Sequence, residues 1–207
     1  MRKKVSVLLV VPAFILLAGC GATEVLQEED MQMEDNSMQE EQAFSGEYSK
    51  MNASESTLSF VGGSSILDHQ GEFENFDMNL TLDDTDPADL EKASLRVAID
   101  ATSVKTDSGG LDGHLTKEEF FDMENYPEIT FVSTSIRASG DNMYSILGDL
   151  TIKEMTKSVT LDALIVDDGM TVTFDIPRKE FNVGNDSYGD KLLDDMVPVK
   201  AEIVFES

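Results

Sequence analysis

The sequence predicts an all-β domain: an antiparallel, eight-stranded barrel with one or two short helices. From about residue 48 onward, apolar and polar residues alternate with a period of two in about eight separate segments, which is typical of strands with one buried and one wet face. Turn-forming residues separate neighbouring segments, and helical signals are few. Because eight such strands can close on themselves and leave no exposed edge, a barrel is favoured over a two-sheet sandwich.

The predicted strands follow one another along the chain. The clearest alternation covers residues 76–83, 95–99, 159–165, 170–176 and 197–205, and three further segments lie near residues 58–61, 129–136 and 144–152. Tight-turn sequences stand between two pairs of neighbours: Ser139-Gly140-Asp141-Asn142 and Asp167-Asp168-Gly169. These two pairs are therefore predicted to form hairpins.

Two short helical segments are expected between the strands. Residues 86–92 begin with an aspartate followed by a proline, which suits a helix start but leaves room for only a turn or two. Thr116 and Glu119 have the spacing of a capping box, which predicts a short helix near residues 111–121. The Tyr126-Pro127 step must end that helix.

The first twenty residues predict export. Basic residues at positions 2–4 precede an apolar run over residues 5–17, the pattern of a secretory signal covering residues 1–19. The tetrapeptide Leu17-Ala18-Gly19-Cys20 resembles the bacterial lipoprotein cleavage box, which implies cleavage before Cys20 and acylation of that cysteine. Acyl chains on Cys20 would hold the protein on a membrane of the bacterial cell envelope, on the periplasmic side or at the cell surface.

Charge divides the rest of the chain and excludes one class of partner. Residues 20–47 carry nine acidic residues and no basic one, so we expect an acylated cysteine followed by a disordered acidic tether, with the folded domain at residues 48–207. The formal charge is −26, and it becomes −29 when the three basic residues of the signal are removed. A field of that sign argues against binding to nucleic acid.

At eight strands, the interior of a barrel is either filled by side chains or wide enough for one slender ligand, and periodicity does not choose between the two. A hollow tube could bind a greasy chain by removing apolar surface from water. Core packing explains each inward residue singly, so the binding prediction belongs to the cavity as a whole. The residues expected to line it are Phe60, Leu80, Val97, Phe131, Ile146, Leu161, Phe174 and Ile203.

Several segments carry a resemblance to a known family. The clearest are Asp112-Gly113-His114-Leu115, the run from Phe120 to Pro127 and Ile129-Thr130-Phe131, followed by the run from Gly148 to Lys153 and by Met155-Thr156-Lys157. Over residues 48–205 the order and spacing of these segments resemble the YceI-like family of envelope proteins. The resemblance implies a lipocalin-like barrel whose apolar cavity holds an isoprenoid chain or a similar amphipathic lipid.

The best-matched segments also suggest polar residues for the mouth of the barrel. Asp112 and His114, with Thr156 and Lys157 as neighbours, are candidates for contact with a ligand head group. The alternative is that His114 only braces the short helix against the rim. Where the family commonly has a basic pair, this chain has Gly110 and Leu111, so the resemblance implies a less charged head group here.

Other chemistry has little support in the sequence. The two histidines lie far apart, the only cysteine is the predicted acylation site, and no calcium-loop or nucleophile-elbow motif occurs, so we expect no metal, no cofactor and no catalytic residue. The long segment 184–196 is either a lid or a tolerated insertion. A filled barrel that acts through its surface and a lipid-ester hydrolase remain the alternatives, and the sequence leaves open whether the domain forms a homodimer.

Overall fold

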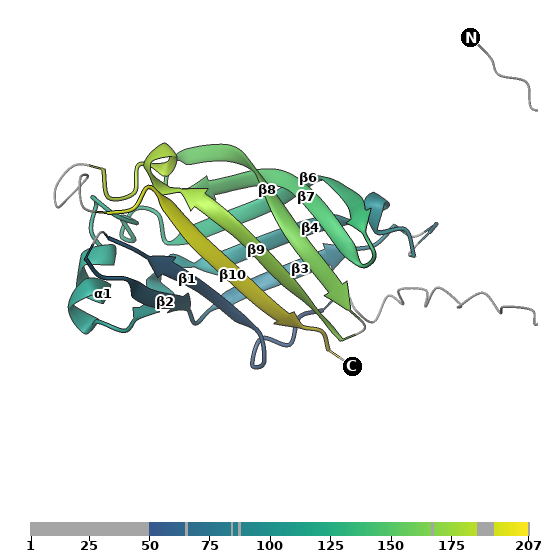
Figure 1. The fold of residues 1–207 in the computed structure, drawn as a ribbon, viewed down its shortest axis with the longest axis horizontal. Coiled ribbons are helices and arrows are strands. Elements are labelled where there is room, and N and C mark those ends of the chain that lie inside the picture. Colours follow the sequence, from purple (N-terminus) through teal and green to yellow (C-terminus); the bar gives the residue numbers. More distant parts are fainter. Residues whose placement is uncertain are drawn as a thin grey trace, which may run out of the picture. The chain divides into compact units, whose positions relative to one another are not determined.

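The computed structural model describes residues 50–206, except positions 65, 84, 87, 167 and 186–192. Ten strands and one α-helix, α1 (Gly109–Leu115), make up this part of the chain (Figure 1). The strands are β1 (Thr57–Gly62), β2 (His69–Phe73), β3 (Phe76–Thr81), β4 (Ser94–Asp100), β5 (Val104–Thr106), β6 (Glu128–Gly140), β7 (Met143–Ile152), β8 (Met155–Val166), β9 (Gly169–Pro177) and β10 (Met196–Val204). Three short 3-10 helices accompany them: η2 (Leu90–Lys92), η3 (Ala101–Ser103) and η4 (Arg178–Phe181).

The strands form a continuous antiparallel ring. The sheet order is β3-β4-β6-β7-β8-β9-β10-β1-β2-β5, so its ends are β3 and β5. Only residues 74–75 separate β2 from β3, and η3 alone separates β4 from β5. β2 and β3 together are one bent strand, and β4 and β5 are another. The two bent strands pair with each other through β2–β5 and β3–β4. Read in this way, the pairings run all the way round a barrel of eight strands.

The all-β, antiparallel class is therefore confirmed, and the number of strands differs from the prediction. All eight expected segments form strands, and both expected hairpins occur, between β6 and β7 and between β8 and β9. The two additional strands, β2 and β5, are short and carry almost no alternation. β2 is the first half of the bent strand that continues as β3, and β5 is the second half of the one that begins as β4, so ten segments still make an eight-stranded ring.

The helical predictions need correction. Thr116 does not cap the start of a helix: α1 ends there, its N-cap is Ser108, and the Thr116 hydroxyl donates to the carbonyl of Gly113 at 3.1 Å. In the segment predicted from Asp86, the described residues include the 3-10 turn η2, whose N-cap is Asp89. Both α1 and η2 are shorter than a helix that is stable in isolation, so packing against the barrel decides their position.

One half of the barrel interior is a packed core. Toward the β6–β7 and β8–β9 hairpins, inward side chains from seven strands meet, and each is at most 5% exposed. Burying each large aliphatic or aromatic side chain contributes about 1.5–3 kcal/mol, so this half supplies much of the stability. The residues are Met78, Leu80, Leu95, Ile136, Ile146, Leu161, Ala163, Ile165, Met170, Val172 and Ile203.

A β-bulge in β6 changes which residues point inward. The pairing with β7 shifts register between Ser133 and Ser135. Before the shift Ile129 and Phe131 are buried, and after it Ile136 is buried, so the inward positions change from odd to even residue numbers.

Among the described residues no helix is long and apolar enough to cross a membrane.

Candidate functional site

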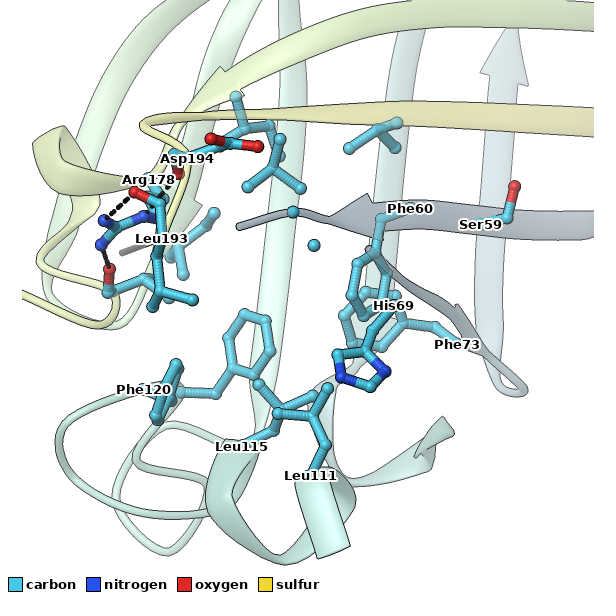
Figure 2. A pocket seen from close by; sticks show the side chains of 18 of the residues that line it. Ser59, Phe60, His69, Phe73, Leu111, Leu115, Phe120, Arg178, Leu193 and Asp194 are labelled. Atoms are coloured by element: carbon cyan, nitrogen blue, oxygen red, sulfur yellow. Dashed lines mark hydrogen bonds between the residues drawn. The ribbon is translucent and has the colours of Figure 1, made fainter. Parts of the chain in front are cut away.

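The other half of the barrel is hollow. A cavity of about 460 Å³ opens at the end of the barrel where α1 lies (Figure 2). Its volume is in the range of about 300–1,000 Å³ typical of small-molecule sites, and its wall is almost entirely apolar. The apolar residues of the wall are Leu58, Phe60, Leu67, Phe73, Ile99, Leu111, Leu115, Phe120, Phe121, Ile129, Leu150, Ile152, Phe174, Ile176, Val183, Leu193, Val197 and Val199.

The division between core and cavity runs across single strands. In β10, Val197 and Val199 line the cavity, whereas Ile203, on the same face, lies in the packed core. In β9, Phe174 and Ile176 line the cavity and Met170 lies in the core. Alternation thus places a side chain inside the barrel, and its position along the strand decides whether it meets other side chains or empty space.

Aromatic rings build one wall of the cavity. The rings of Phe60 on β1 and Phe73 on β2 have centroids 5.5 Å apart, and Phe73 meets Phe121 edge-on at 5.9 Å. Figure 2 shows Phe60 and Phe73 beside each other, with Leu111 and Leu115 reaching toward the cavity from α1. The series joins two strands to the segment after α1, so it fixes the helix against the cavity opening.

Arg178 is a buried cation beside the cavity. It is 5% exposed, and its guanidinium donates to four backbone carbonyls: those of Val183 and Gly184 at 3.0 Å, Asp194 at 2.8 Å and Leu193 at 3.2 Å. These carbonyls come from both sides of the segment 186–192. The fixed fork of an arginine suits this task, and its donors are committed to the backbone instead of facing the cavity.

A histidine–aspartate pair stands at the opening. His69, which lines the cavity, bonds through Nδ1 to the carboxylate of Asp107 at 2.7 Å. The backbone N–H of Gln70 donates to the other carboxylate oxygen at 3.2 Å. The hydrogen bond from His69, reinforced by that from Gln70, lowers the pKa of Asp107 below its ordinary value of 3.8. Asp194 also lines the opening, so the described carboxylates there favour uncharged or cationic groups.

The predicted polar residues lie in different places. His114 lines the cavity and is exposed, with its Nδ1 3.4 Å from the ammonium nitrogen of Lys117. Asp112 instead accepts hydrogen bonds from the backbone and the hydroxyl of Thr106, at 2.8 and 2.7 Å, which fastens α1 to β5. Thr156 bonds to the hydroxyl of Thr151 at 2.9 Å, and neither it nor Lys157 lines the cavity.

The predicted apolar lining also divides. Phe60 and Phe174 line the cavity. The other six lie among the packed residues outside it: Leu80, Val97, Phe131, Ile146, Leu161 and Ile203. Whether any of these residues contacts a ligand remains a prediction. Cys20, the signal over residues 1–19, the tether over residues 20–47 and most of the 184–196 loop lie outside the described residues.

Sequence reasoning missed Lys153, which is only 8% exposed. Its ammonium group donates to the carbonyls of Glu118 at 2.8 Å and Asn182 at 3.3 Å, so it ties the segment after α1 to η4. Lys153 and Arg178 are two of only 15 basic residues in an acidic chain, and Lys153 ends one of the segments that carry the family resemblance. That coincidence was the available signal.

The described residues offer no metal cluster, and the Ser64 hydroxyl on the cavity wall is held by backbone groups. Over this part of the chain, no three histidine, cysteine or carboxylate side chains gather as metal ligands would. Ser64, on the cavity wall, donates its hydroxyl proton to the carbonyl of Leu67 at 2.8 Å and accepts from two backbone N–H groups. That hydroxyl is engaged in a turn and is not activated by a base.

Comparison with known proteins agrees with the fold. The model of the YceI-like domain matches residues 50–205, which is nearly the whole described part. Among curated proteins, Protein YceI of Escherichia coli O17:K52:H18 is 36% identical over 126 residues, 56% of this chain. The chain spans 64% of the length of that relative.

Solved structures extend the comparison. BcnA of Burkholderia cenocepacia has a TM-score of 0.67 and 29% identity, and the match covers 75% of this chain and 99% of that one. The matched part is thus nearly the whole of a chain whose crystal structure is known. A polyisoprenoid binding domain from Saccharophagus degradans has a TM-score of 0.59 at 14% identity, covering 76% of this chain and 97% of its own, which shows a shared fold.

Proposed function

The chain belongs to the YceI-like family, and from this premise we propose that its barrel binds an isoprenoid or a similar amphipathic lipid without catalysing a reaction. One observation carries the proposal: half of the barrel is an apolar cavity of about 460 Å³ that opens at one end. A chain of isoprene units gains about 25 cal/mol for each Å² of apolar surface that leaves water. No reactive group is needed for such binding.

The relatives support the choice of ligand class. The Saccharophagus domain that shares the fold is described as polyisoprenoid binding, and at 14% identity its ligand is a guide for this chain and not evidence of the same ligand. The wall of this cavity offers long aliphatic and aromatic surface, which suits a slender branched hydrocarbon. The engagement of the Ser64 hydroxyl by backbone groups favours binding over ester hydrolysis.

The proposed site of action rests on the N-terminal sequence. We propose that Cys20 is acylated and anchors the protein at the bacterial cell envelope, where a lipid carrier would find its cargo. Growth with an alkyne-bearing fatty acid tests this point. The wild-type protein should carry the label and the Cys20→Ala variant should not; equal labelling of both would contradict acylation at this residue.

Native mass spectrometry tests the binding proposal. Residues 48–207, exported behind a cleavable signal and purified without detergent, should carry one apolar passenger whose extract fragments in isoprene or acyl units. Added polyprenol should load any empty fraction. A bare protein mass in every preparation, together with no uptake of polyprenol, would favour the alternative in which the protein acts through its surface.

A further inference from the structure

Two large aliphatic side chains beside the cavity opening point into water. Ile66 is 83% exposed, the highest value among the large apolar residues that the structure describes, and its neighbour Leu67 is 58% exposed. They lie between β1 and β2, at the same end of the barrel as α1 (Figure 1). Isolated exposed apolar residues are common, so their setting has to carry the argument.

The backbone holds these side chains outward. Ser64 makes three bonds across the turn: its hydroxyl donates to the Leu67 carbonyl at 2.8 Å, accepts from the Leu67 N–H at 3.0 Å, and its own N–H donates to the same carbonyl at 3.0 Å. The hydroxyl also accepts from the Ile66 N–H at 3.3 Å. Ser64 further forms a β-bridge with Leu193, which anchors the turn to the other side of the opening.

The exposed surface continues into the cavity. Leu67 is more than half exposed and at the same time lines the cavity wall, so an apolar path leads from solvent past Leu67 to Phe60 and Phe73. A lipid that leaves a bilayer through water must expose its whole chain, whereas a mouth in contact with the bilayer avoids that exposure. Side chains that enter the boundary of a bilayer make such a contact.

We propose that Ile66 and Leu67 dock the mouth of the barrel on a lipid bilayer, so that cargo passes between membrane and cavity without crossing water. The inference rests on the proposed function, because it gives the same cavity its route of loading. The charged side chains beside the opening indicate which kind of bilayer the mouth can contact. Asp68, Asp107 and Asp194 are exposed beside the opening, and they would be repelled by an anionic surface. The mouth therefore fits a zwitterionic bilayer.

The absence of tryptophan from the sequence allows a direct test. Ile66→Trp in residues 48–207 places the single indole at the mouth. With vesicles of phosphatidylcholine, its emission should shift to shorter wavelength and be quenched by brominated acyl chains, and anionic vesicles should give a smaller shift. Val166→Trp is the matched control: Val166 is 44% exposed and lies beside the β8–β9 turn, at the opposite end of the barrel. It should not shift.

A kinetic measurement separates docking from cargo binding. Ile66→Ser should keep the capacity for a fluorescent polyprenol and load it from phosphatidylcholine vesicles about tenfold more slowly, because Ile66 lies outside the cavity wall. No shift for Ile66→Trp, or an equal shift for Val166→Trp, would overturn docking. A shift that follows protein concentration without vesicles would also overturn it, in favour of a second copy of the chain. An unmutated domain that takes up no polyprenol would instead contradict the proposed function.

Discussion

The ring of Phe60 lies against the backbone of Gly71, its partner in register on the neighbouring strand. A Cβ at position 71 would overlap three carbons of that ring, so only glycine leaves Phe60 its place on the cavity wall. The same ring is packed against Phe73. One missing side chain therefore permits the aromatic wall of the cavity.

Replacing this glycine should disturb both stability and binding. In Gly71→Ala the Phe60 ring must move into the cavity or out of its preferred rotamer, and overpacking of this kind costs about 1–3 kcal/mol. We expect a lower free energy of unfolding in urea and a weaker affinity for polyprenol. Gly62→Ala is the matched control for stability, because nothing lies within 4 Å of a Cβ there. A loss of equal size in both variants would contradict the account.

A larger side chain in the hollow half should exclude the ligand. Val197→Phe projects a ring into the cavity from β10, and we expect the bound passenger seen by native mass spectrometry to fall at least about tenfold, with the free energy of unfolding within about 1 kcal/mol of wild type. Val132→Phe, on an exposed position of β6, controls for the added ring. Unchanged loading of Val197→Phe would show that the ligand binds elsewhere.

A substitution in the packed half should have the reverse effect. Ile146 is 1% exposed and does not line the cavity, so Ile146→Ala should lower the free energy of unfolding by about 2–5 kcal/mol and leave the passenger bound. Thermal unfolding and native mass spectrometry on the same samples check both halves of this expectation. A variant that stays stable but loses its passenger would contradict the division into core and cavity.

Removing Arg178 should loosen the segment that it holds. Arg178→Met leaves four backbone carbonyls without their donor, and we expect a loss of about 3 kcal/mol or more in the free energy of unfolding. Amide exchange should speed up at residues 183–185 and 193–195. Lys200→Met, which breaks an exposed pair with Glu202, should change stability by about 0.5 kcal/mol or less. Equal effects of the two variants would contradict the special position of Arg178.

The pair of His69 and Asp107 predicts a pH dependence. Because the folded-state pKa of Asp107 lies below 3.8, its contribution to stability is present above that value and is lost as the pH falls through the folded pKa. The difference in stability between wild type and Asp107→Asn should therefore shrink in acid. A carboxyl NMR titration should also find the midpoint of Asp107 closer to 3.8 in His69→Leu than in wild type. An unchanged midpoint would contradict the assigned cause.

The sequence predicts which strand residues face inward, and it does so well because the alternation of side chains is a local property of the strand. It could not predict where along a strand the packed core ends. Ile203 and Val199 look alike in the sequence, and they lie in different halves of the barrel because of what the other strands bring opposite them. The predicted lining therefore contained more packed residues than cavity residues.

The bounds of the predicted short helix and the existence of two short strands could not be read from the sequence, for physical reasons. The helix α1 contains three glycines in seven residues, which is poor helix-forming sequence, and it is held by tertiary contacts such as the bond from Thr106 to Asp112. The bent-strand halves β2 and β5 have only five and three residues, which is too short for a sustained alternation to show in the sequence. Lys153 and Arg178 were missed because composition rules place cations on the surface.

The packed half of the barrel has a consequence for traffic. Since side chains block the interior beyond Ile146, the described barrel offers no passage from end to end, and a guest must leave by the entrance through which it came. If the proposed function holds, such a protein would store or ferry one guest at a time and would not conduct a stream of them. The net direction of transport would then depend on how abundant the guest is in each membrane that the entrance contacts.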